Sequence, residues 1–191
     1  MGNMKKALFY TIMLTAAEVI LGLIVTLLVL PSMNWSATNK PGALETTIAN
    51  YTISRWVRRG ANNQSNPLLP ETSDNLKTAK AEFSEHCATC HGLDGSGVNR
   101  IEADFYPPVP KLTGQIQSWS DGQIYYVIAN GIGWSAMPGF SRNHESEDIW
   151  DTVLWIRHLA KLTPDEKAQL ENEMKAGSEQ HEHTMHGNAG N

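Results

Sequence analysis

The residues with the clearest chemistry are the two cysteines of the chain, which lie in Cys87-Ala-Thr-Cys90-His91. Covalent attachment of a c-type haem requires this spacing, because each thiol can add to one haem vinyl group while the adjacent histidine lies under the iron. A zinc ribbon would need a second cysteine pair, and a thioredoxin-like site would need a βαβ context. The motif therefore predicts one haem c, attached through Cys87 and Cys90, with His91 as an iron ligand.

A second axial ligand can be sought among the seven methionines. Six of them lie in or beside an apolar N-terminal segment or in a C-terminal extension: Met1, Met4, Met13, Met33, Met174 and Met185. Met137 remains, and Pro138 biases its backbone toward an extended conformation, which suits a loop that presents sulfur to a haem. We therefore predict Met137 as the distal ligand. Simple packing of Met137 on the haem is the alternative, and His144 is the rival ligand.

Helical elements are expected on both sides of this motif. Ser73 is a plausible N-cap for a helix whose apolar positions fall on one face: Leu76, Ala79, Phe83 and Cys87. A capping box at Ser120 and Gln123 predicts a helix that ends at Asn130-Gly131. A closing helix is expected to start at 145–148 and to bury these residues: Ile149, Trp150, Val153, Leu154 and Trp155.

Residues 76–162 resemble a class I cytochrome c domain, through the helix entering Cys-x-x-Cys-His-Gly, the later Met-Pro and the aromatic closing helix. The resemblance implies an all-α fold around one covalently attached haem, with His91 and Met137 on the iron. It also implies that the stretch 104–112 passes the proximal histidine, with the Pro110 carbonyl accepting its hydrogen bond and Leu112 beside the haem. A proline-rich turn without haem contact is the alternative. The indole N–H of Trp119 could donate to a haem propionate or to any other acceptor.

An apolar segment at residues 7–30 predicts a transmembrane helix, because 24 residues can span a hydrocarbon core of about 30 Å. A cleaved signal peptide would have a shorter apolar region and a small-x-small site, which Trp35 interrupts. Lys5 and Lys6 precede the segment, so the positive-inside bias places the N-terminus in the cytoplasm and the haem domain outside it. The expected location is the bacterial inner membrane, with a single span and a periplasmic haem domain.

One stripe of this helix is polar or small: Thr11, Thr15, Glu18, Gly22 and Thr26. Such residues let helices approach closely, and a mid-membrane carboxyl group needs a partner or a proton. The stripe predicts a contact with a membrane helix of another redox subunit. A plain anchor with a neutral Glu18 is the alternative.

The predicted organisation is a cytoplasmic N-terminus at 1–6, a transmembrane helix at 7–30, an exported linker at 31–70, a cytochrome c domain at 71–162, a helix at 163–177 and a flexible tail at 178–191. Within the linker, apolar residues interleaved with Arg55, Arg58 and Arg59 indicate a short amphipathic helix near lipid headgroups or an acidic partner. The tail contains His181, His183 and His186, which are metal-ligand types in a polar terminus of the kind that is usually disordered.

The charge distribution limits the function. The chain of 191 residues has a net charge of −5; residues 1–70 contribute +4 (six basic, two acidic) and residues 71–191 contribute −9 (nine basic, eighteen acidic). An acidic domain of this kind argues against nucleic-acid binding. With both axial positions filled there is no site for a small-molecule substrate, so we expect a non-enzymatic electron carrier. The leading expectation is a subunit of a respiratory or photosynthetic complex. A tethered periplasmic shuttle, and a haem sensor or peroxidase-like enzyme with a displaceable Met137, are the alternatives.

Overall fold

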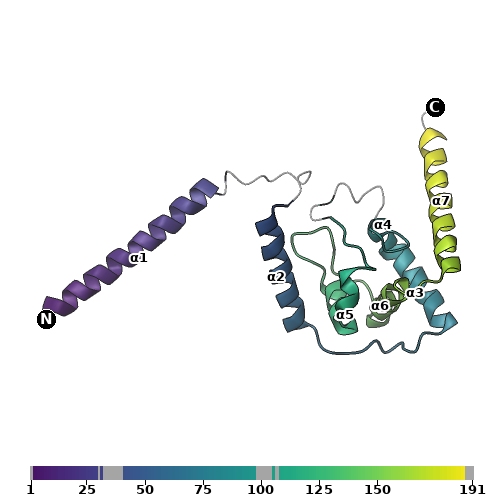
Figure 1. The fold of residues 1–191 in the computed structure, drawn as a ribbon, viewed down its shortest axis with the longest axis horizontal. Coiled ribbons are helices and arrows are strands. Elements are labelled where there is room, and N and C mark those ends of the chain that lie inside the picture. Colours follow the sequence, from purple (N-terminus) through teal and green to yellow (C-terminus); the bar gives the residue numbers. More distant parts are fainter. Residues whose placement is uncertain (1, 30, 32–40, 98–104, 106–107, 188–191) are drawn as a thin grey trace. The chain divides into compact units, whose positions relative to one another are not determined.

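The computed structural model describes residues 2–29, 31, 41–97, 105 and 108–187, and its regular elements within these ranges are all helical (Figure 1). The helices are α1 (Gly2–Val29), α2 (Ala43–Gly60), α3 (Ser73–His86), α4 (Ala88–His91), the 3-10 helix η3 (Gln115–Ser118), α5 (Asp121–Asn130), α6 (Ser146–Leu159) and α7 (Pro164–Gly187). They belong to two compact units, residues 1–39 and 40–191. The all-α prediction is confirmed.

Helix α1 forms the first unit. Its segment Met4–Leu28 has a mean hydropathy of 2.2 and is not buried within the chain, so its length and composition fit a membrane span. Three hydroxyl groups of the polar stripe bond to carbonyls of α1 itself: Thr11 to Ala7 at 2.6 Å, Thr15 to Ile12 at 3.0 Å and Thr26 to Gly22 at 2.8 Å. These threonines therefore need no external partner, and Glu18 is the residue of the stripe for which a partner or a proton matters most.

The core of the second unit forms where α3 packs against α6. Ala79 and Phe83 of α3 are fully buried, and Leu76 and Cys87 pack beside them. The predicted apolar residues of α6 are all buried, so both predicted faces are confirmed. The cap of α3 lies one residue earlier than predicted, at Thr72. With Thr72 as N-cap the third helical residue is Asn75, whose side chain accepts the Thr72 N–H at 2.7 Å; with Ser73 it would be Leu76, which cannot.

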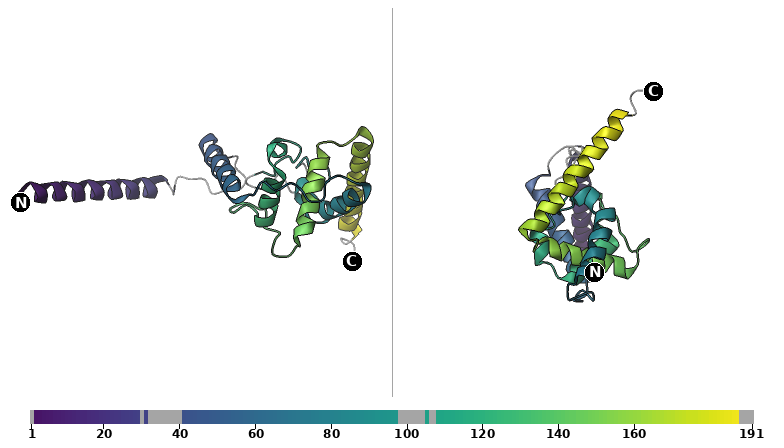
Figure 2. Two further views of the ribbon diagram at one scale, coloured as in Figure 1. Left: turned by 90° about the horizontal axis from the view of Figure 1, so that it is seen from below. Right: turned by 90° about the vertical axis from the view of Figure 1, so that its right-hand side faces the viewer.

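Helix α5 covers one side of α6 and is itself covered by α2, an arrangement that can be followed in Figure 2. The capping box of Ser120 and Gln123 is present, and Gly131 ends α5 as predicted. Val57 of α2 is 1% exposed, and the Trp56 ring lies 4.8 Å from the Tyr126 ring of α5. Because of these contacts α2, which lies where a short helix was expected within residues 31–70, is part of the compact unit of residues 40–191.

The segment that follows α2 is also built into the domain. Asn66 is 4% exposed and its side-chain amide donates to the Trp150 carbonyl at 2.9 Å. Its backbone N–H donates to Asp121 Oδ2 at 3.1 Å. The described part of the domain therefore includes residues 43–70 as well as the predicted 71–162.

Helix α7 starts at the predicted capping box, where Glu166 Oε2 accepts the Thr163 N–H at 2.8 Å. His158 joins its first turn to the segment before α3, with contacts of 3.2 Å to Glu166 and 3.3 Å to Glu71. The helix continues through Gly177 to Gly187, beyond the end predicted at Gly177. A glycine inside a helix costs only about 1 kcal/mol, and the flanking residues are good helix formers. The backbone of His181, His183 and His186 is helical.

Candidate haem site

The attachment motif occupies the turn that follows α3. Cys87 is the C-cap residue of α3, and its carbonyl accepts the backbone N–H of Cys90 at 3.1 Å and that of His91 at 2.9 Å. Residues 88–91 form the single turn α4, which ends at Gly92 with φ 74°. The helix therefore delivers both thiols and His91 within one turn, at the edge of the α3–α6 core.

Cys87 is half-buried in this turn and packs against the core. Burial raises the pKa of its thiol to about 12, and the negative charge of Glu82 adds to the effect. The thiol is therefore neutral at physiological pH and packs as an apolar group against the core. Cys87 and Cys90 are not joined by a disulfide.

His91 points one ring nitrogen into the protein. Its Nδ1 atom is buried and has no hydrogen-bond partner of good geometry among the described residues. Burial lowers the pKa of the imidazole, while the nearby Pro110 carbonyl acts in the opposite direction by favouring the protonated ring. The structure thus brings His91 and Pro110 together, as the resemblance implies, although the approach falls short of a full hydrogen bond.

Leu112 joins the segment after the motif to the core. It is 6% exposed, and its backbone N–H donates to the Gly95 carbonyl at 2.8 Å. A Cβ on Gly97 would lie 3.0 Å from the Val109 carbonyl oxygen, so the two ends of this segment run close together. Most of the stretch between them, including Asp104 and Pro107, lies outside the described residues.

Met137 lies in the loop between α5 and α6 and packs, half-buried, against the core. Two hydrogen bonds hold its backbone: its N–H donates to Ser135 Oγ at 3.1 Å, and its carbonyl accepts the Ile132 N–H at 3.1 Å. Gly131, with φ 68°, lets the chain turn back on itself, and a Cβ there would lie 2.5 Å from Gly139 N. Trp134, in the same loop, is fully exposed and has a positive φ of 64°.

His144, the rival ligand, contacts the end of α3. Its ring centroid lies 4.5 Å from the His86 ring and 5.2 Å from the Phe140 ring. It lines a small pocket together with Glu82, His86 and Cys87, and its Nδ1 is buried without a partner among the described residues. The structure therefore places His144 near the attachment turn, and sequence distance alone does not separate it from Met137.

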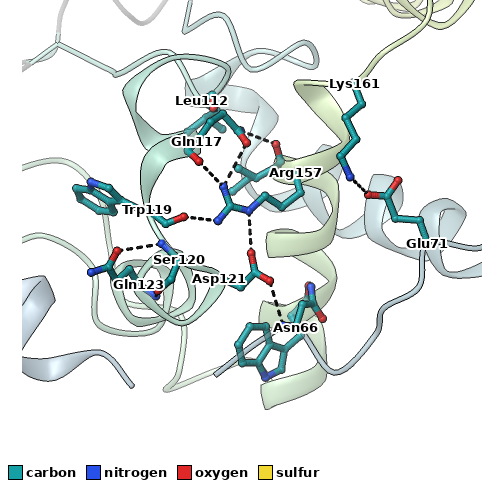
Figure 3. Close-up of polar contacts among 12 residues, drawn as sticks. Asn66, Glu71, Leu112, Gln117, Trp119, Ser120, Asp121, Gln123, Arg157 and Lys161 are labelled. Atoms are coloured by element: carbon teal, nitrogen blue, oxygen red, sulfur yellow. Dashed lines mark hydrogen bonds and ion pairs between the residues drawn. The ribbon is translucent and has the colours of Figure 1, made fainter. Parts of the chain in front are cut away.

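A polar cluster around Arg157, which the sequence analysis did not predict, binds the backbone carbonyls of Leu112, Gln117 and Trp119 (Figure 3). Arg157 of α6 donates to Asp121 Oδ1 at 2.8 Å, to the Gln117 carbonyl at 3.0 Å and to the Trp119 carbonyl. Gln117 in turn donates to the Leu112 carbonyl at 2.8 Å. The sequence around Arg157 does not predict this role, because a charged residue near the end of a helix is usually exposed to solvent. The Trp119 carbonyl is an acceptor in this cluster, and the Trp119 indole ring points away from Arg157 (Figure 3).

The residues present fit a haem c. Two thiols within one helical turn, an imidazole with its second nitrogen buried beside a carbonyl, and a thioether in a braced loop are the donor types that such a group takes. Three or more His, Cys, Asp or Glu side chains do not gather as a metal site anywhere among the described residues.

Residues 74–156 match the family model described as cytochrome c oxidase, cbb3-type, subunit III. Residues 74–156 therefore form a c-type cytochrome domain. Its family cofactor is covalently bound haem c, and the two cysteines suffice for one attachment site. A cytochrome c domain transfers electrons, and this coarse function follows from the family. The matched region starts at α3 and ends inside α6, so the family accounts for the α3–α6 core and not for α2.

Two solved structures are similar to parts of this chain. A chain of the reducing HAO-like protein complex of Kuenenia stuttgartiensis is 20% identical with a TM-score of 0.42, over 50% of this chain and 49% of that one. This chain thus spans about half of that relative. Cytochrome cL of Methylophaga aminisulfidivorans is 18% identical with a TM-score of 0.38, over 71% and 83% of the two chains. No curated protein matches the sequence.

Proposed function

We propose that this cytochrome is a membrane-anchored electron carrier in which Cys87 and Cys90 hold one haem c and His91 and Met137 are its axial ligands. Two observations on His91 carry the proposal: its Nδ1 is buried without a hydrogen-bond partner among the described residues, and the Pro110 carbonyl lies near its imidazole. In a metal-bound imidazole the other ring nitrogen donates to such a carbonyl. When bound, haem c supplies an iron that gains or loses one electron.

The chain's own residues set the conditions for that exchange. The Pro110 carbonyl orients the His91 ring and favours the tautomer with a proton on Nδ1, which leaves Nε2 free to bind a metal. The Ile132 N–H and Ser135 hydroxyl fix the backbone of Met137, so its thioether can be offered from a defined position. Leu112, Phe83 and Leu159 supply buried apolar surface in this region and exclude water. If His91 and Met137 both bind the iron, no coordination position is left for a small-molecule substrate.

Optical spectra test the ligand assignment in the full-length, haem-loaded protein. The ferric protein should show a sulfur-to-iron charge-transfer band, and Met137→Ala should remove that band while the haem stays attached. A low-spin ferric protein that lacks the band, and that loses its low-spin spectrum in His144→Ala but keeps it in Met137→Ala, would identify His144 as the ligand and contradict the assignment. A ferric protein without the band, and with rapid peroxide turnover, would favour the sensor or peroxidase-like alternative.

The proposed setting is a bacterial inner membrane, with Lys5 and Lys6 on the cytoplasmic side and the haem domain on the periplasmic side. We favour a subunit of a respiratory or photosynthetic complex over a tethered shuttle. Glu18 in the middle of the span supports this, and so does the matched family, which is named for an oxidase subunit. Mild detergent extraction with size analysis separates the two versions, because a lone monomer in its micelle would contradict the subunit version.

A further inference from the structure

One face of helix α2 is exposed to solvent. Ile53, Val57 and Gly60 lie on the side that meets α5. At 100° per residue the opposite side carries Leu44, Ile48, Tyr51, Arg55, Arg58 and Arg59 within an arc of about 100°. We call these six residues the outer face of α2. Leu44, Ile48 and Tyr51 are 74%, 56% and 62% exposed, so a continuous apolar stripe faces outward on the first half of the helix.

The second half of the outer face is positively charged. Arg55, Arg58 and Arg59 are exposed, and none forms an ion pair with another described residue. Glu45 is the one acidic residue of α2, so the helix carries +2, whereas residues 71–191 carry −9. The outer face of α2 is therefore a basic, apolar surface on an otherwise acidic domain.

The position of α2 in the chain limits what can cover this face. Thirteen residues separate the end of α1 at Val29 from the start of α2 at Ala43, and a fully extended chain of that length reaches at most about 45 Å. If α1 spans a membrane, the first turn of α2 stays within that distance of the lipid at all times. A surface held so close meets lipid at a high effective concentration.

We propose that the outer face of α2 binds the anionic lipid surface into which α1 is inserted. Leu44, Ile48 and Tyr51 enter the boundary between headgroups and acyl chains, and the three arginines bind lipid phosphates, as interfacial amphipathic helices do. The other face of α2 holds the cytochrome domain through Val57 and Trp56, so the contact fixes that domain to the membrane surface despite its net negative charge. This inference rests on the membrane span and not on the axial ligands.

The test uses full-length, haem-loaded protein in nanodiscs with a nitroxide label at one position, in the reduced, diamagnetic state. In discs of phosphatidylcholine with phosphatidylglycerol, a label at Ile48→Cys should become several-fold less accessible to an aqueous paramagnetic quencher and more accessible to oxygen. A label at Lys77→Cys, on exposed α3, should stay aqueous. A label at Leu14→Cys reports whether α1 is in the bilayer, which separates failure of the anchor from failure of the surface.

Charge reversal provides the matched control. R55E/R58E/R59E should return the Ile48 label to water, whereas K77E/R142E/K167E changes the net charge equally at exposed sites elsewhere and should not. Visible spectra of both variants confirm that the haem fold is intact. An Ile48 label that stays aqueous in anionic discs while the Leu14 label is buried overturns the proposal. Protection that occurs only in native membranes, and not in lipid discs, overturns it as well and identifies a protein partner.

Discussion

Arg157 Nε donates to Asp121 Oδ1 at 2.8 Å, and this ion pair joins α6 to the first turn of α5. Both side chains are more than four-fifths buried, with 19% and 18% exposed. Asp121 also accepts from Asn66, so three segments far apart in the sequence meet at one carboxylate (Figure 3). Arg157 adds bonds to two carbonyls of the segment 117–119, which precedes α5.

Arg157→Met should therefore destabilise the cytochrome domain by about 2–3 kcal/mol, because Asp121 and two carbonyls lose a charged donor. Urea unfolding of the haem-loaded protein followed at the haem absorbance would measure this loss. Lys77→Met, which removes an equal charge at an exposed position, is the control. A loss below about 1 kcal/mol would mean that water replaces the guanidinium without cost.

Gly131→Ala should disturb the Met137 loop. Its φ of 68° strains any residue with a Cβ, and that Cβ would lie 2.5 Å from the Pro138 carbonyl carbon and 2.7 Å from the Met137 oxygen. We expect a weaker charge-transfer band and a stability loss of more than about 1 kcal/mol. Gly133→Ala in the same loop is the matched control, because nothing lies within 4 Å of its Cβ. Equal effects of the two variants would argue against a braced ligand loop.

Asp151 makes stability depend on pH. Burial, with the like charges of Glu147, Glu82 and Asp148, raises its pKa from 3.8 to about 6. The folded state thus binds more protons between these values, and stability falls as pH rises through this window. Asp151→Asn should add about 1 kcal/mol at pH 7.5 after allowance for solvent screening, and much less at pH 4. Urea unfolding at pH 7.5 and pH 4 measures this gain in stability, with the exposed Glu171→Gln as control. A larger gain at pH 4 than at pH 7.5 would contradict a raised pKa of Asp151.

The acidic domain should prefer a basic partner. Residues 71–191 carry −9, so the rate of electron exchange with a basic soluble redox protein should fall as ionic strength rises. Stopped-flow measurement of the second-order rate constant at several salt concentrations would show how this rate changes with ionic strength. An acidic redox protein provides the comparison and should show the opposite slope. A rate with the basic protein that increases with salt would place the docking site away from the acidic surface.

Local signals predicted much of this fold. The capping boxes at Ser120 and Thr163 and the apolar faces of α3 and α6 depend on residues three to four positions apart, which a sequence displays directly. The attachment motif is equally local. The cap at Thr72 was missed by one residue because two adjacent hydroxyls compete, and the third helical residue decides between them.

Contacts between distant residues were not predictable in the same way. The polarity of Asn66 and Arg157 is typical of surface positions, and only the tertiary structure gives each a buried partner. The packing of α2 on α5 depends on Val57 and on the Trp56–Tyr126 contact, for which no periodic pattern specifies the partner helix. The approach of Pro110 to His91 was expected from the family resemblance alone.

Asn66 also has a practical consequence for anyone who wishes to work with a soluble fragment. A fragment that starts at residue 71, where the cytochrome c domain was predicted to begin, would leave the Trp150 carbonyl and one oxygen of Asp121 without their donors. It would also uncover the face of α5 that Val57 and Trp56 cover. A fragment that starts at residue 41 keeps these groups together. A soluble fragment should therefore begin before α2, and it is longer than the region of residues 74–156 that the family model matches.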